Sequence, residues 1–144
     1  MSAEREIMLK ASLSSGRFQT FLGMELLAHN AEQGSVEIKL AWRDDFERGP
    51  GTGQWHGGAI AALIDIAGDF ALIALLGRGV PTIDLRIDYL RPAIRTDLIA
   101  TARTLRSGKS IGSVDIEVRD KNGKVVAVGR GSYSTLEPKS GSMI

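Results

Sequence analysis

Residues 51–76 read Gly51-Thr-Gly-Gln-Trp-His-Gly-Gly-Ala-Ile-Ala-Ala-Leu-Ile-Asp-Ile-Ala-Gly-Asp-Phe-Ala-Leu-Ile-Ala-Leu-Leu76, a glycine-rich turn followed by a run that is apolar almost all round. This pattern predicts a helix over 57–76 that other parts of the protein must cover, because a helix apolar on every side cannot face water. Asp65 and Asp69 lie within the run, one helical turn apart. A buried carboxylate is costly unless it has a partner or a chemical role, so both are candidate functional residues.

The same run is long enough to cross a membrane, but each of its two carboxylates would cost about 3 kcal/mol on insertion. We therefore expect the core helix of a soluble domain. The first residues, 1–7, lack the basic start and apolar segment of a signal peptide, which favours a cytoplasmic location.

The composition excludes several classes of function. The 144 residues contain no cysteine and two histidines far apart in the sequence, so we expect neither thiol chemistry nor a zinc site. A net charge of +1 argues against a nucleic-acid or membrane-surface binder. An anionic partner would have to be held by a local cluster of cations.

Apolar residues alternate with polar ones on both sides of the helical run. A short amphipathic helix is predicted over 3–13, and a hairpin over 23–42 with its turn at 30–34. Four further strands are predicted after the long helix, at 83–89, 97–106, 114–118 and 124–136. We expect one α+β domain over 1–144, with a core over 23–136 in which an antiparallel sheet wraps around the long central helix. A second copy of the chain is expected to cover the other side of that helix.

Four features together resemble the hotdog-fold acyl-CoA thioesterases of the phenylacetate-pathway type. They are His56-Gly57-Gly58, Asp65 seven residues later, the strand Thr82–Pro92, and the triplet Gly108-Lys109-Ser110. The resemblance implies a hotdog fold and hydrolysis of an acyl-CoA thioester without metal or cofactor. It also implies a homodimer or a dimer of dimers, that is, a homotetramer.

The resemblance implies a role for each residue of the first motifs. Asp65 would be the nucleophile or the general base, the amide of Gly57 would polarise the thioester carbonyl, His56 would orient that end of the site, and Thr82 would orient water. Physically, Gly57 and Gly58 leave the first amides of the helix free to bind an oxyanion. Asp65 lies roughly 12 Å further along the helix, too far to reach the same carbonyl. In the family the acid accordingly comes from the opposite subunit.

Some of these residues have a second reading. His56 could simply cap the helix, Asp65 could be a structural acid, and Asp69 could tune Asp65 or line the acyl pocket. Many relatives have Asn or Gln seven residues before Gly57, where this chain has Pro50. Gln54 is the nearest amide, and we expect it to take the missing role if the role is filled at all.

Coenzyme A carries phosphates, so cations are expected at the mouth of the pocket. The candidates, each of which could equally belong to a solvated rim, are Arg91, Arg95, Arg106 and Lys109, with Gly108 and Ser110 flanking Lys109. The substrate is expected to be a small aryl- or medium-chain acyl-CoA. Two other functions stay open, namely a hotdog dehydratase or hydratase and a non-catalytic module that binds acyl-CoA or an aryl ligand.

Overall fold

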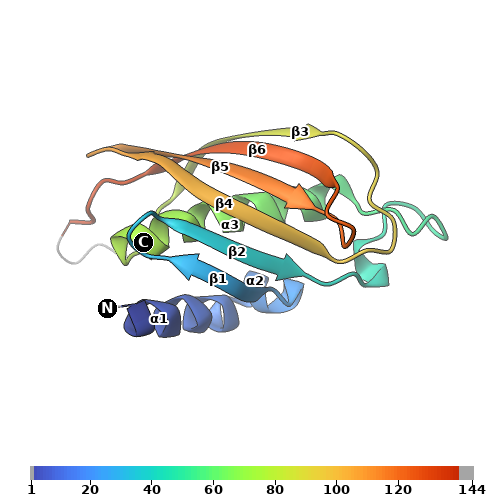
Figure 1. Cartoon of the computed structure of the whole chain (residues 1–144), viewed down its shortest axis with the longest axis horizontal. Helices are drawn as coiled ribbons and strands as arrows, with labels where there is room; N and C mark the ends of the chain where they lie inside the picture. Colours follow the sequence, from blue (N-terminus) through green and yellow to red (C-terminus); the bar gives the residue numbers. More distant parts are fainter. Residues whose placement is uncertain (1, 140–144) are drawn as a thin grey trace.

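A long helix, α3 (Gly57–Leu76), lies under a six-stranded antiparallel sheet that curls around it (Figure 1). The computed structural model describes residues 2–139. The bounds of α3 are those that the apolar run predicts. The other elements, in chain order, are α1 (Ser2–Ser15), α2 (Arg17–Leu22), β1 (Glu25–Asn30), β2 (Ser35–Leu40), the short 3-10 turn η1 (Asp44–Phe46), β3 (Thr82–Tyr89), β4 (Leu98–Ser107), β5 (Ile111–Arg119) and β6 (Val125–Ser134).

The strands lie in the order β1-β2-β4-β5-β6-β3, and every neighbouring pair is antiparallel. The chain therefore leaves β2, passes through α3, and places β3 at the far edge beside β6 before it returns to add β4 next to β2. The expected antiparallel sheet around the helix is confirmed, and with it the α+β hotdog fold.

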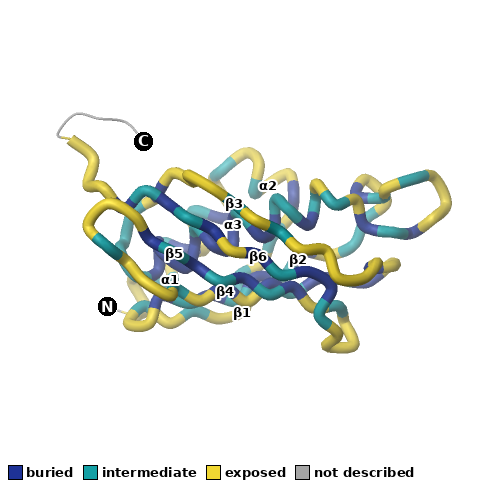
Figure 2. Tube along the Cα trace, turned by 90° about the horizontal axis from the view of Figure 1, so that it is seen from above, coloured by how far each residue is buried: buried dark blue, intermediate teal, exposed yellow. Residues whose placement is uncertain are grey.

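Alternation along the strands separates the core from the solvent. On β5, Val114, Ile116 and Val118 are buried against α3, whereas Asp115 and Glu117 point to the outer face. The outer face carries ion pairs, including those of Asp115 with Arg103 and Arg130. In Figure 2 the buried residues concentrate along α3 and the strands that cover it.

The N-terminal segment differs in part from the prediction. The predicted helix 3–13 extends over Ser2–Ser15, and a second helix follows Gly16, which has an extended backbone. The sequence does not predict this second helix, α2, because only Leu22 of its six residues is buried and no apolar periodicity marks it. Both helices pack on the β1 side of the domain, away from β3 (Figure 1).

The edge strand β3 is poorly covered. Its residues on the α3 side should be buried by alternation, yet Ile83 is 56% exposed and Leu85 and Ile87 are only half-buried. The exposed run along β3 is visible in Figure 2. An apolar strand face and an unpaired strand edge are thus left open on the same side of the domain.

Candidate active site

The first turn of α3 leaves one backbone donor free. The imidazole of His56 caps the helix, because its Nδ1 accepts a hydrogen bond from the N–H of Gly58 at 2.8 Å. The next two amides, those of Ala59 and Ile60, donate to the carbonyl of His56. Within residues 2–139 the N–H of Gly57 has no acceptor. The expectation that both glycine amides are free is therefore wrong for Gly58 and holds for Gly57.

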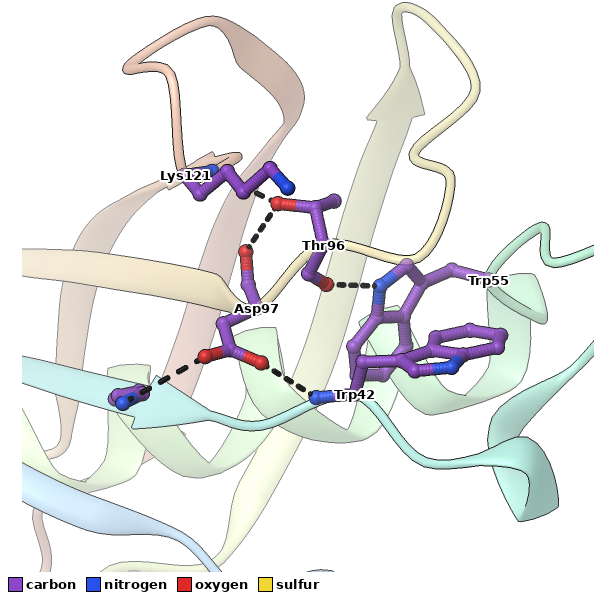
Figure 3. Close-up of polar contacts among 6 residues, drawn as sticks. Trp42, Trp55, Thr96, Asp97 and Lys121 are labelled. Atoms are coloured by element: carbon purple, nitrogen blue, oxygen red, sulfur yellow. Dashed lines mark hydrogen bonds and ion pairs between the residues drawn. The ribbon is translucent and has the colours of Figure 1, made fainter.

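The residue two positions before Gly57 is fixed from several sides. The indole Nε1 of Trp55 donates to the carbonyl of Thr96 at 2.7 Å (Figure 3). The backbone N–H of Trp55 donates to the carbonyl of Ala93 at 2.9 Å. Phe46 stacks on the Trp55 ring with the centroids 5.3 Å apart. Trp55 is almost fully buried, so the loop that delivers the chain to α3 is anchored in the core.

Thr96 and Asp97 extend this anchor to neighbouring strands. The Thr96 hydroxyl accepts a hydrogen bond from the N–H of Lys121, in the turn after β5, and donates to the carbonyl of Asp97 (Figure 3). The Asp97 carboxylate accepts from the N–H of Trp42 at 2.8 Å and pairs with Lys39 at 3.6 Å. The sequence does not predict this network, because its members are polar residues scattered over several strand ends.

An open cavity of about 540 Å³ lies beside the start of α3. It brings together four of the predicted site residues, namely Gln54, Gly57, Gly58 and Arg91. Arg48 and Tyr89 also line the cavity and were not predicted as site residues. The Tyr89 hydroxyl donates to the carbonyl of Gly57 at 2.7 Å and so helps to hold the first helical turn.

Asp65 and Thr82, predicted separately, are in direct contact. The Thr82 hydroxyl donates to Oδ1 of Asp65 at 2.7 Å. Asp65 is half-buried on α3, and Thr82 is the first residue of the edge strand β3. The acid therefore lies on the open side of the domain, next to the uncovered strand.

Asp69 lies one turn beyond Asp65 and has a different environment. Its Oδ1 accepts a hydrogen bond from the N–H of Val80 at 3.3 Å. Burial raises the pKa of Asp69 from 3.8 to about 7; the Val80 hydrogen bond opposes this effect and the charge of Asp65 adds to it. Asp69 thus titrates near neutral pH.

The predicted phosphate-binding triplet lies elsewhere. Gly108, Lys109 and Ser110 form the turn between β4 and β5, at the opposite end of the sheet from the loop before α3 (Figure 1). This turn lies near the C-terminal end of α3, because Gly112, which follows it, packs against Leu72. Lys109 and Ser110 are exposed.

The two remaining predicted cations are also outside the cavity lining. Arg95 lies in the segment before β4 and its N–H donates to the carbonyl of Gly53, whereas Arg106 lies near the end of β4, beside the Gly108 turn. Within one chain the predicted residues therefore form separate groups. No group of three His, Asp or Glu residues within 2–139 is placed to hold a metal ion.

Comparison with known proteins identifies the family. The sequence profile of the thioesterase superfamily matches residues 52–127, which include the start of α3, Asp65, Thr82 and the Gly108 turn. The chain belongs to the thioesterase superfamily.

Relatives within the superfamily match most of the chain. A protein of Halobacterium salinarum whose name proposes an esterase is 39% identical over 125 residues, which cover 79% of this chain and 81% of that protein. The medium/long-chain acyl-CoA thioesterase YigI of Escherichia coli is 27% identical over 137 residues, which cover 81% and 83%. The solved structure of E. coli PaaI, from the phenylacetic acid degradation operon, superposes with a TM-score of 0.84 at 25% identity and covers 94% of this chain and 96% of that one.

Proposed function

We propose that this superfamily member hydrolyses the thioester of a small aryl- or medium-chain acyl-CoA. One observation carries the proposal: α3 presents an unoccupied backbone donor, the N–H of Gly57, to an open cavity and carries a hydroxyl-bound carboxylate, Asp65, two turns further along. The names of two relatives point the same way, since YigI is a medium/long-chain acyl-CoA thioesterase and PaaI an acyl-coenzyme A thioesterase.

The free amide of Gly57 supplies one half of the site and polarises the thioester carbonyl, which is the electrophile of the reaction. A thioester carbonyl oxygen that accepts from the Gly57 N–H also lies at the positive end of the α3 dipole. Both effects stabilise the negative charge that develops on this oxygen as the carbonyl carbon is attacked. Tyr89 supports the geometry by holding the carbonyl of the same glycine.

The carboxylate supplies the other half. Asp65 acts either as the nucleophile that attacks the carbonyl carbon, with water then hydrolysing the mixed anhydride, or as the general base that removes a proton from the attacking water. In both cases the C–S bond breaks and coenzyme A leaves as its thiol, while the acyl group leaves as a carboxylic acid. The Thr82 hydroxyl, bound to Asp65, orients the attacking group.

Within one chain the two halves do not meet. Eight residues separate Gly57 from Asp65 on a straight helix, which corresponds to roughly 12 Å at 1.5 Å per residue. A second chain with its α3 antiparallel to the first would place the partner's Asp65 beside Gly57 and, by symmetry, form a second site. The open edge and uncovered apolar face of β3 support such a homodimer, which two copies could extend to a dimer of dimers.

The same arrangement accounts for the separated cations. Arg48 and Arg91 line the cavity beside Gly57, and no carboxylate lies within 4 Å of either guanidinium in the described residues. In antiparallel helices, the C-terminal part of the partner's α3 extends past the start of the first α3, so the partner's Lys109 approaches the same cavity. We assign these cations, with Gly108 and Ser110 around Lys109, to the phosphates of coenzyme A.

Two further residues complete the proposed site. Gln54 takes the amide role that Pro50 leaves open, and Asp69 borders the acyl pocket.

A panel of acyl-CoA substrates with a thiol-reactive dye tests the proposal. We expect free coenzyme A to appear with at least one small aryl- or medium-chain substrate and with no added metal or cofactor. We also expect the protein to be cytoplasmic. Binding of the panel without thiol release would indicate a binding module instead. Turnover of an enoyl-CoA to its hydroxyacyl form without thiol release would indicate a hydratase.

A further inference from the structure

Two residues on adjacent strands contact Asp65, one at its side chain and the other at its backbone. Thr82 on β3 and Tyr133 on β6 are directly paired across the two strands. The Thr82 hydroxyl donates to the Asp65 carboxylate at 2.7 Å, and the Tyr133 hydroxyl donates to the Asp65 backbone carbonyl at 3.0 Å. One cross-strand pair therefore holds both the side chain and the main chain of the same acid.

Tyr133 is buried and remains a hydrogen-bond donor. Its side chain has no exposed surface, and burial together with the charges of Asp65 and Asp69 raises the pKa of its hydroxyl. The group is consequently protonated throughout the pH range in which proteins are folded. A helical carbonyl has two lone pairs, so the Asp65 carbonyl accepts from Tyr133 in addition to its bond within the helix.

The surrounding core leaves room for this hydroxyl specifically. A Cβ added at Gly68 would lie 2.1 Å from the Tyr133 hydroxyl oxygen, and one added at Gly131 would lie 2.5 Å from its ring. Any side chain larger than glycine at position 68 would thus push the hydroxyl away from α3. Phenylalanine would fill the same core volume, so the hydroxyl and the glycine that admits it need an explanation other than packing.

We propose that Tyr133 is a positioning residue for the reaction: it fixes the turn of α3 that carries Asp65, while its cross-strand neighbour Thr82 fixes the carboxylate. This inference rests on the proposed function. The two hydroxyls come from a single strand pair, so the backbone and the rotamer of Asp65 are set relative to the same β3–β6 ladder. A reacting group displaced by about 1 Å can lose roughly 100-fold in rate, so even small movements of this turn have a measurable effect.

The first arm of the test is kinetic. Tyr133→Phe removes the hydroxyl alone, and we expect kcat to fall by roughly 10-fold with KM within about twofold of the wild type. The matched control is Ile38→Val, which shortens a fully buried side chain on β2, a strand that contacts neither β3 nor β6. The control should lower Tm while kcat stays unchanged. If Tyr133→Phe leaves kcat unchanged, or if the control loses as much kcat, Tyr133 has only a structural role.

The second arm uses the close approach of Gly68. Gly68→Ala should displace the Tyr133 hydroxyl and lower kcat, because the added Cβ would lie 2.1 Å from the hydroxyl oxygen and 2.9 Å from the ring carbon that carries it. Phenylalanine keeps that ring carbon, so the double variant Gly68→Ala, Tyr133→Phe should lose less kcat than the product of the two single losses. If the two single losses of kcat multiply in the double variant, the two substitutions act independently, and the effect of Gly68→Ala does not pass through the Tyr133 hydroxyl.

The third arm does not depend on activity. The 13C resonance of the Asp65 side-chain carboxyl should shift in Tyr133→Phe and stay in place in Ile38→Val. If the wild type hydrolyses no acyl-CoA, the proposed function fails, yet this resonance still reports whether Tyr133 positions Asp65. An unshifted resonance in Tyr133→Phe overturns the inference whatever the activity.

Discussion

The imidazole of His56 accepts the hydrogen bond of the Gly58 amide at 2.8 Å, which leaves the neighbouring amide of Gly57 as the donor of the first helical turn that has no acceptor within residues 2–139. A helix start offers four amides to a ligand, and here the protein itself satisfies three of them. The polarising role therefore rests on one N–H group, and its removal can be tested separately from the fold.

Gly57→Pro removes this N–H at the position where proline is well tolerated in a helix. The preceding residue, His56, already has φ −67° and ψ 132°, the extended conformation that a following proline requires. We expect kcat to fall by about 100-fold or more, as on loss of one oxyanion donor. The control is Gly57→Ala, which keeps the amide and whose Cβ would lie at an ordinary 3.4 Å from Tyr89. Equal activity of the two variants would remove the amide from the mechanism.

Asp65→Asn keeps the size of the side chain and removes its charge. We expect at least a 100-fold loss of kcat with acyl-CoA binding nearly intact, measured by steady-state kinetics and calorimetry. Because the site is proposed to be shared, mixing Asp65→Asn chains with Gly57→Pro chains should restore activity in hybrid dimers, each of which holds one complete site. Hybrids that native mass spectrometry verifies but that remain inactive would show that each chain carries a whole site.

Two variants separate the capping role of His56 from its proposed role in the active site. His56→Ala should lower stability by about 1 kcal/mol, because the Gly58 amide loses its acceptor, and His56→Asn should restore that stability. We expect both variants to lose roughly 10-fold in kcat, since neither has an imidazole next to the Gly57 amide. Full activity in His56→Asn would indicate that His56 is a cap and nothing more.

Lys109→Ala should raise KM for acyl-CoA without changing kcat, because a phosphate contact stabilises the ground state and the transition state alike. A truncated thioester without the nucleotide should show no difference. Raising the ionic strength from 0.1 M to 1 M should reduce the effect, as the Debye length falls from about 10 Å to about 3 Å. Lys10→Ala, on the exposed face of α1, is the control, and an equal change there would assign Lys109 to the solvated rim.

Asp69 should make stability depend on pH. Its pKa is about 7 in the folded chain and has the ordinary value near 3.8 in the unfolded chain, so the folded state binds an extra proton between these pH values. The resulting stabilisation is complete below about pH 4 and is lost as the pH rises through 7. Asp69→Asn keeps an acceptor for the N–H of Val80 and carries no charge. Its free energy of unfolding at pH 8 should therefore exceed that of the wild type by about 2 kcal/mol, roughly half of the stabilisation that 1.4 kcal/mol per pKa unit would give for a fully buried group. Urea unfolding at pH 5 and pH 8 measures this, and equal differences at both pH values would contradict it.

The sequence predicts the parts of this fold whose pattern is local. The bounds of α3 follow from an apolar run between His56 and Gly77, and the strands follow from alternation. The position of β3 beside β6 does not follow, because Thr82 and Tyr133 are far apart in sequence and only the folded core pairs them. For the same reason the contact of Thr82 with Asp65, the anchoring of Trp55 by Thr96, and the lining residues Arg48 and Tyr89 are visible only in three dimensions.

The position of β3 also determines when the domain can fold. β3 ends at residue 89 and the strand beside it, β6, spans residues 125–134, so during synthesis β3 has no neighbouring strand until nearly the whole chain has been made. Loop closure over that distance is slow compared with formation of the local β1–β2 hairpin. Until β6 arrives, β3 has no neighbouring strand to hold it in the sheet. A chain truncated before β6 leaves β3, and with it Thr82, without its neighbouring strand, and is therefore a poor starting point for a functional fragment.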